Sequence, residues 1–363
     1  MGLFLLLYFT LYSLLHIYLY RRVSSLLSRS SKLFLLTFST YMILSPFLWR
    51  YLDREGLYAV NYYIALSSLL WMGFVIYFFL TGLVIDLISR FKPISPRKRA
   101  ELTLLLSLIL SLYSHIETYH LQVYRFTINT PKLPEGKEIK ILHISDLHLG
   151  PVMGEDRIGM VLEVYRRERP HMVVATGDMV DGNMEGKDRL AGLLRLMDPP
   201  LGKYAVLGNH EFYRGTGQAV EFLERAGFKV IRCGWVETGD YLAVAGVDDP
   251  AGGGVCDEER ALKGVDPARF VILLKHRPSV KKETLPLIDL QLSGHSHGGV
   301  LFFVGLTVLR LIYETDRGIK EMAPGKFIVV SKGVGTGGPP MRLFSPPDVA
   351  VITLYCRGSC RRR

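Results

Sequence analysis

The 363-residue sequence has little cysteine, and its first third has little charge. Its 4 cysteines, Cys233, Cys256, Cys356 and Cys360, are too few and too scattered for a disulfide-rich scaffold or a four-cysteine zinc site. Residues 1–120 hold only 11 of the 44 Lys and Arg residues and 5 of the 34 Asp and Glu residues. A hydrophobic content of 49% excludes a disordered chain. The uncharged stretches near the start also exclude a single soluble globule.

Four segments without any charge account for this scarcity. They are Gly2–Tyr20, Leu33–Trp49, Leu57–Ile85 and Leu102–Ile116, of 19, 17, 29 and 15 residues. A membrane-spanning helix needs about 20 apolar residues, so the first three predict spans and the fourth is short enough to be an interfacial or core helix instead. Arg21 and Arg22, rather than a small-residue cleavage site, follow the first segment, which favours a retained helix. We predict a multi-pass helical anchor of about four helices over residues 1–118.

The loops between these segments differ in charge. The first loop holds Arg21, Arg22, Arg29 and Lys32, the second Arg50 and Arg54 offset by Asp53 and Glu55, and the third Arg90, Lys92, Arg97, Lys98 and Arg99. Loops rich in Lys and Arg stay in the cytoplasm. The first and third loops are therefore predicted inside, and everything after Ile116 outside. If Leu102–Ile116 does not span, the second half of the chain is cytoplasmic instead.

The sequence of the second half of the chain predicts a soluble domain. Apolar strand patterns at 139–145, 172–175 and 204–207 alternate with helical patterns at 157–169 and 188–197, which predicts an α/β domain with substantial sheet. Residues 121–356 hold 29 basic and 29 acidic residues, and this balance argues against nucleic-acid binding. Residues 357–363 form a basic tail.

Five polar clusters each follow an apolar strand of this domain. They lie at 144–150, 177–182, 208–211, 275–278 and 293–299. Side chains that follow strand ends gather at the sheet edge where α/β folds hold their sites, so we expect the clusters to meet there. A lone Asp-x-His or Gly-Asp pair is common at turns, so the inference depends on all five occurring together. The glycine-rich stretch 333–338 lacks the Gly-Lys-Ser/Thr ending of a phosphate loop and predicts a turn.

The residue types in these clusters indicate metal binding. The candidate ligands are Asp146, His148, Asp178, Asn209, His276, His295 and His297. Imidazole, carboxylate and amide donors without a thiolate suit Mn, Fe, Zn, Co or Ni. Seven ligands exceed the need of one ion, whereas two divalent ions sharing a carboxylate could activate a hydroxide and hold phosphate oxygens.

In order, the clusters read D-x-H, G-D-x-x-D, G-N-H-[DE], H and G-H-x-H. This pattern resembles the calcineurin-like metallophosphoesterases, in particular their membrane-anchored branch, over about residues 121–355. Lys332, Asp348 and Val300 depart from that branch's usual Arg, Glu and Gln, but no candidate ligand is missing. The resemblance implies a four-layer α/β/β/α sandwich over residues 119–356, and metal-dependent hydrolysis of a phosphate ester or pyrophosphate.

The resemblance also implies a role for each residue. Asp146, His148 and His297 would bind one divalent ion, Asn209, His276 and His295 the other, and Asp178 would bridge both. His210 would lie outside the metal shell, stabilise the transition state and protonate the leaving group, as suits an imidazole near neutral pKa. Asp181 would orient ligands.

Other functions stay open at this point. One is a UDP-2,3-diacylglucosamine pyrophosphohydrolase-like activity in lipid A synthesis, which would need a cytoplasmic site. Another is a non-catalytic, metal-bound membrane sensor or scaffold, and a nuclease is disfavoured by the balanced charge. The apolar run 300–306 directly after the last ligands is typical either of a core strand or loop packed on the domain, or of a surface that admits an amphiphilic substrate, such as a lipid phosphate, from the membrane. An extracytoplasmic tail would allow Cys356 and Cys360 to pair.

Overall fold

The computed structural model describes residues 2–254, 256–299 and 312–357. The chain forms two compact units. One consists of Met1–Glu117 with Gly338–Leu343, and the other of Thr118–Gly337 with Phe344–Arg363. The apolar run 300–306 and the pairing of Cys356 with Cys360 fall outside the described residues.

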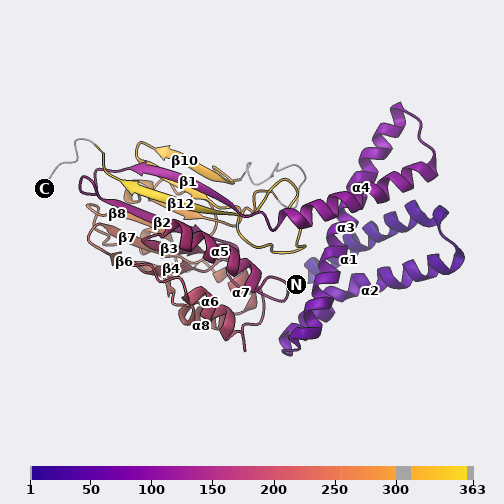
Figure 1. The fold of residues 1–363 in the computed structure, drawn as a ribbon, viewed down its shortest axis with the longest axis horizontal. Helices are drawn as coiled ribbons and strands as arrows, with labels where there is room; N and C mark the ends of the chain where they lie inside the picture. Colours follow the sequence, from indigo (N-terminus) through magenta and orange to yellow (C-terminus); the bar gives the residue numbers. More distant parts are fainter. Residues whose placement is uncertain (1, 255, 300–311, 358–363) are drawn as a thin grey trace. The chain divides into compact units, whose positions relative to one another are not determined.

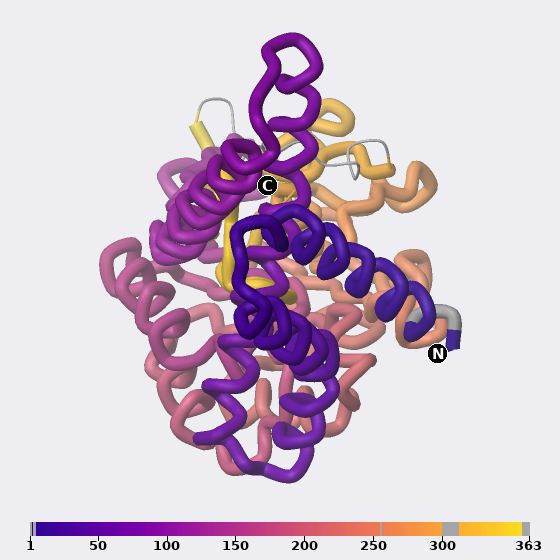
Figure 2. The backbone as a smooth tube through the Cα atoms, turned by 90° about the vertical axis from the view of Figure 1, so that its right-hand side faces the viewer, coloured from indigo at the N-terminus to yellow at the C-terminus, as the bar shows by residue number. Residues whose placement is uncertain are grey.

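The first unit is helical (Figures 1 and 2). Its elements are α1 (Gly2–Val23), a 3-10 turn (Ser24–Leu26), α2 (Arg29–Arg54), α3 (Tyr58–Phe91) and α4 (Pro96–Glu117). Among the described residues, α2, α3 and α4 are long and apolar enough to cross a membrane. The short segment Leu102–Ile116 lies inside α4, which gains length from the polar turn at Pro96–Glu101. A membrane crossing by α1 stays a prediction.

Polar contacts hold the helices of this unit together. Ser45 and Ser68 join α2 to α3 at 2.7 Å, and Thr81 and Ser107 join α3 to α4 at 2.7 Å. Small hydroxyl side chains of this kind allow membrane helices to approach closely.

An ion-pair cluster gathers three helix ends of the same unit. Arg22 Nη1, in the last turn of α1, lies 2.6 Å from Asp86 Oδ1 near the end of α3. Arg99 Nη1, at the start of α4, lies 3.1 Å from the same oxygen. The loops after α1 and after α3 therefore leave the unit at one common end.

The second unit contains two six-stranded sheets. The first has the order β1 (Gln122–Asn129), β12 (Asp348–Tyr355), β2 (Glu138–Ile144), β3 (Met172–Thr176), β4 (Lys203–Val206) and β5 (Lys229–Val230). The second has the order β10 (Gly318–Ala323), β11 (Lys326–Val330), β9 (Leu290–Ser293), β8 (Phe270–Leu274), β7 (Leu242–Val247) and β6 (Cys233–Thr238). Strands β2 to β5 run parallel, as do β7, β8, β9 and β11.

Alternating side chains place these sheets between helices. On β2, Ile139 and Ile141 pack in the core between the sheets, whereas Leu142 and Ile144 pack against the helices outside. Those helices are α5 (Glu155–Glu168), α6 (Asp188–Arg195) and α8 (Thr216–Arg225), seen beside the first sheet in Figure 1. The outer layer on the second sheet is thin, built around the short helix α9 (Glu258–Ala261) and a 3-10 turn (Leu285–Leu287). The predicted four-layer α/β/β/α sandwich is confirmed.

The structure differs from the sequence prediction in how the sheets are divided. Three polar clusters follow strands of the first sheet and two follow strands of the second, so two sheet edges share the site rather than one. Strands β6, β10, β11 and β12 were not predicted.

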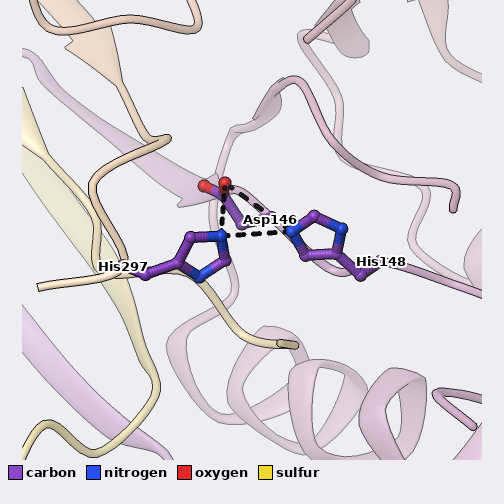
Figure 3. Close-up of side chains that lie close together, drawn as sticks. All are labelled: Asp146, His148 and His297. Atoms are coloured by element: carbon purple, nitrogen blue, oxygen red, sulfur yellow. Dashed lines mark hydrogen bonds and ion pairs between the residues drawn. The ribbon is translucent and has the colours of Figure 1, made fainter. Parts of the chain in front are cut away.

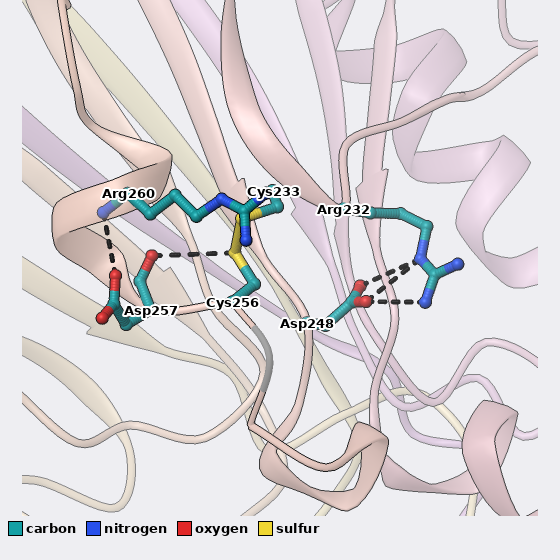
Figure 4. The surroundings of a disulfide bond; sticks show 6 residues. All are labelled: Arg232, Cys233, Asp248, Cys256, Asp257 and Arg260. Atoms are coloured by element: carbon teal, nitrogen blue, oxygen red, sulfur yellow. Dashed lines mark hydrogen bonds and ion pairs between the residues drawn. A yellow bond between two sulfur atoms is a disulfide. The ribbon is translucent and has the colours of Figure 1, made fainter.

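A disulfide between Cys233 and Cys256 was also not predicted from the sequence (Figure 4). It joins the start of β6 to the segment that follows a 3-10 turn at Pro250–Gly252. The cysteines are 23 residues apart and meet because β6 pairs antiparallel with β7, which leads into that turn.

Candidate metal centre

The candidate ligands follow five strand ends and converge between the two sheets. Asp146 and His148 follow β2, whereas His297 follows β9 of the other sheet. The Nε2 atoms of His148 and His297 lie 3.2 Å apart, and Asp146 Oδ1 lies 3.4 Å from His297 Nε2 (Figure 3). These three side chains could hold a metal ion.

A second group lies beside the first. His276 Nε2 lies 3.2 Å from Asp178 Oδ2, 3.1 Å from His295 Nδ1 and 3.2 Å from Asn209 Oδ1. Asp178, His276 and His295 form another group with metal-binding geometry. Asp178 Oδ2 is also 3.9 Å from His148 Nε2 of the first group, so this carboxylate lies between the two. All seven predicted ligands therefore come together.

Hydrogen bonds orient these side chains. His276 Nδ1 donates to the Thr176 carbonyl at 2.8 Å, which fixes the ring so that Nε2 is directed at the site. The backbone N–H of His295 donates to Asp146 Oδ2 at 3.0 Å, and that of His210 donates to Asp178 Oδ1 at 2.8 Å. One oxygen of Asp178 is thus occupied by the backbone while the other faces the ligands.

The charges of the site favour a cation. Burial opposes a charge on Asp178, yet His276 and the nearby imidazoles hold the pKa of this carboxyl well below its usual range. Burial also opposes a charged His276, but Asp178 and Asp146 raise the pKa of this imidazole to about 10. Because the buried carboxylates overcome desolvation, the pocket stabilises positive charge, as a metal site must.

The backbone at the candidate ligands is unusual. Of the 7 described non-glycine residues with positive φ, 5 are candidate ligands: Asp146, His148, Asp178, His295 and His297, with φ between 48° and 69°. Such conformations cluster at functional sites, where the surrounding structure holds them in place. This feature points to the same residues as the side-chain geometry.

A glycine-rich loop supports the first group. A Cβ at Gly335 would lie 2.1 Å from the Leu147 carbonyl oxygen, and the Gly335 N–H donates to the Asp146 carbonyl at 2.7 Å. Only glycine therefore fits where this loop passes the backbone of Asp146 and Leu147. The stretch for which the sequence predicted a turn is a bent, irregular loop in the structure, and it lies against the backbone of the first ligand segment.

His210 lies next to both groups without joining the ligand contacts above. Its Nδ1 is 2.8 Å from Asp181 Oδ1, and its Nε2 is 4.0 Å from Asp178 Oδ2. Arg214 Nε donates to Asp181 Oδ1 at 3.1 Å. Burial opposes a charged His210, but the hydrogen bond and ion pair with Asp181 raise its pKa to about 8. His210, Asp181 and His148 also form a group of metal-binding type.

Sequence reasoning gave no role to Glu211 or to Arg277. Glu211 is fully buried, and its carboxylate accepts from the N–H groups of Asp178, Val180 and Gly208 at 2.7–3.0 Å. It thereby fixes the turn that carries Asp178. The acidic fourth position of the G-N-H-[DE] motif was the signal for Glu211. Arg277 donates to the carboxylate of Asp249 at 2.7 and 2.9 Å, and no sequence pattern indicates that pair.

The sequence is similar to known metallophosphoesterases. The calcineurin-like phosphoesterase family matches residues 139–299. An uncharacterized metallophosphoesterase of Aquifex aeolicus is 59% identical over 70% of this chain and 99% of its own length. A transmembrane protein with metallophosphoesterase domain from Danio rerio is 30% identical over 71% of this chain and 63% of its own. A solved dimetal phosphatase from Danio rerio covers 60% of this chain and 93% of its own, with 13% identity and a TM-score of 0.41.

The chain belongs to the calcineurin-like metallophosphoesterases. It is a phosphoester hydrolase of a family that normally binds a dinuclear divalent metal centre. The apolar helices, together with relatives named as transmembrane proteins, indicate membrane association.

Proposed function

We propose that the protein hydrolyses a phosphate ester or pyrophosphate at a dinuclear centre held by the seven candidate ligands. The observation that carries the proposal is the position of Asp178 between two ligand groups. In this assignment Asp146, His148 and His297 hold one ion, and Asn209, His276 and His295 the other. The mixed imidazole, carboxylate and amide donors fit Mn, Fe, Zn, Co or Ni.

Two ions bound there supply Lewis acidity, which makes water nucleophilic near neutral pH and offsets phosphate charge. The protein's own groups do the rest. His210 donates from Nδ1 to Asp181 and directs Nε2 toward the site, where a proton on Nε2 can pass to the leaving oxygen. Asp181, itself held by Arg214, keeps the imidazole in that orientation.

A substrate panel tests the proposal. The full chain in detergent is stripped with EDTA, reloaded with Mn, Co, Ni or Zn, and assayed on p-nitrophenyl phosphate, bis(p-nitrophenyl) phosphate, UDP-glucose, phosphatidic acid in micelles and duplex DNA. We expect at least one ester or pyrophosphate to be hydrolysed only after reloading, and DNA to stay intact. Two ions bound per chain without turnover of any substrate would instead favour the sensor or scaffold role. Selective hydrolysis of phosphatidic acid would support a lipid substrate.

We also propose that the catalytic unit is extracytoplasmic. The basic loops after α1 and α3 leave one end of the helical unit, where Asp86 joins Arg22 and Arg99, and such loops stay in the cytoplasm. Helix α4 is long and apolar enough to carry the chain from that end across the membrane. The Cys233–Cys256 disulfide adds support, because disulfides persist mainly in oxidising compartments.

Reporter fusions decide this sidedness. We expect alkaline phosphatase fused after Arg363 to be active and a fluorescent cytoplasmic reporter at the same place to stay dark. The same reporters fused after Lys92, in the third loop, serve as the control and should show the opposite pattern. A fluorescent, phosphatase-negative fusion after Arg363 would make the site cytoplasmic, which the diacylglucosamine alternative requires.

A further inference from the structure

Three side chains outside the ligand set lie at the edge of the metal centre. Tyr213, on α7 (Asn209–Arg214), has its ring centroid 5.9 Å from that of His210. Tyr313 has its ring centroid 6.3 Å from that of His295. Arg277 directly follows His276 at the end of β8. The three residues therefore come from separate segments that converge on the site, and we call them the rim triad.

Neighbouring contacts also connect the three residues of the rim triad to one another. Helix α7, which carries Tyr213, packs against the 3-10 turn at Pro250–Gly252, and the residue that caps this turn, Asp249, binds Arg277. Tyr313 lies beside His295, whose Nδ1 is 3.1 Å from Nε2 of His276, the residue before Arg277 in the chain. Tyr213 is 67% exposed and the Arg277 side chain 31% exposed, so solvent and substrate can reach them.

Arg277 is held so that part of its guanidinium stays available. Its Nε and Nη2 donate to the two carboxylate oxygens of Asp249 at 2.7 and 2.9 Å. Asp249 is buried and caps the 3-10 turn at Pro250–Gly252, and the Cys233–Cys256 disulfide joins the segment after this turn to the start of β6. Within the described part of the chain, no hydrogen bond engages Nη1 of Arg277 or the hydroxyls of Tyr213 and Tyr313.

Building on the proposed function, we propose that the rim triad binds a second phosphoryl group of the substrate, beside the phosphorus that is attacked. Nη1 of Arg277 would donate two N–H bonds and the two phenols one O–H bond each, a donor set that suits phosphate oxygens. The preferred substrates are then phosphate anhydrides or esters carrying another phosphate nearby. In a pyrophosphate, water forms the new P–O bond, the bridging P–O bond breaks, and the rim triad holds the phosphate that leaves.

Competition experiments test this subsite on the full chain. Bis(p-nitrophenyl) phosphate serves as substrate, with imidodiphosphate, which carries two phosphoryl groups, and inorganic phosphate as inhibitors, all with excess metal ion. In Arg277→Gln we expect the inhibition constant of imidodiphosphate to rise about 10- to 100-fold, the range for losing a charge-assisted hydrogen bond. The constant for phosphate should change less than about threefold, and Arg277→Lys should restore part of the loss.

A second arginine–aspartate pair in the same region provides the control for Arg277→Gln. Arg232 binds Asp248 through Nε and Nη2, as Arg277 binds Asp249, but takes no part in the rim triad (Figure 4). Arg232→Gln should leave both inhibition constants unchanged. The proposed subsite would be wrong if imidodiphosphate had the same inhibition constant in Arg277→Gln as in the unchanged protein. It would also be wrong if Arg277→Gln raised the inhibition constants of imidodiphosphate and phosphate by the same factor.

A second variant covers the case in which Arg277→Gln fails to fold because Asp249 loses its partner. The double change Tyr213→Phe with Tyr313→Phe keeps both rings and removes only the hydroxyls. The double change should raise the inhibition constant of imidodiphosphate about tenfold and that of phosphate little. An unchanged inhibition constant for imidodiphosphate would contradict the proposed subsite. Turnover of bis(p-nitrophenyl) phosphate by the unchanged protein separates this outcome from failure of the proposed phosphoesterase activity.

Discussion

Asp178→Asn is expected to lower kcat/KM for phosphoester hydrolysis by at least about a hundredfold. Substituting a residue that only hydrogen-bonds to a metal ligand already lowers metal affinity or activity about 10- to 100-fold, and Asp178 is proposed to be a ligand itself. Asparagine keeps the shape of the side chain and can still accept the N–H of His210. It removes the negative charge from the oxygen that lies 3.2 Å from His276 and 3.9 Å from His148. Both proposed ions would therefore lose a shared ligand charge.

Metal content per chain, measured together with turnover, checks this prediction. We expect fewer than two ions per chain at metal concentrations that load the unchanged protein. Asp188→Asn provides the control, since Asp188 is an exposed aspartate that pairs with Arg225 on the surface. Near-normal turnover in Asp178→Asn with both ions retained would rule out the shared-carboxylate assignment.

His210→Ala is expected to leave the metal content at the level of the unchanged protein while kcat falls about 10²- to 10⁴-fold, the usual contribution of a positioned acid or base. The reason is that His210 lies against Asp181 rather than among the seven candidate ligands. The loss should be smaller for a substrate whose leaving group is acidic, such as p-nitrophenol, because it needs little protonation. Comparing aryl and alkyl phosphate esters measures this difference.

The control for this variant is His171→Ala, because His171 accepts the N–H of Lys140 away from the metal centre. It should change neither turnover nor metal content. If His210→Ala instead loses one ion per chain, His210 is a ligand, as its group with His148 and Asp181 would allow. Its role as a proton donor would then be wrong.

The parts of this fold that follow local patterns could be predicted from the sequence. Strands β2, β3 and β4 are short apolar runs followed by polar clusters, so the sequence marks both the strand and its functional end. Strand β12 could not be placed in the same way, because it comes from the end of the chain and inserts between β1 and β2. Its position depends on long-range pairing that no local pattern records.

The same distinction holds for the candidate site. The seven candidate ligands occur in motifs with fixed spacing, which is why the sequence already predicted that they come together. Arg277 and Asp249 are 28 residues apart and meet only because β7 and β8 run parallel and end together. Tyr213 and Tyr313 are 100 positions apart in the chain and belong to no motif, so only the folded arrangement relates them to the metal centre.

The left-handed backbone at five candidate ligands limits which donors this site can use. Asp, Asn and His adopt that conformation several times more readily than most residues, whereas branched or bulky side chains do so rarely. Carboxylate and imidazole side chains therefore suit this site for two reasons. They are donors for divalent metal ions, and Asp and His tolerate the φ angles near 50° found at Asp146, His148 and Asp178. A softer metal prefers the sulfur donors of Cys and Met, which adopt this conformation less readily than Asp, Asn and His, so such a redesign would strain the backbone at these positions. The donor set available at this site is therefore limited by the backbone conformation of the turns as well as by the chemistry of the side chains.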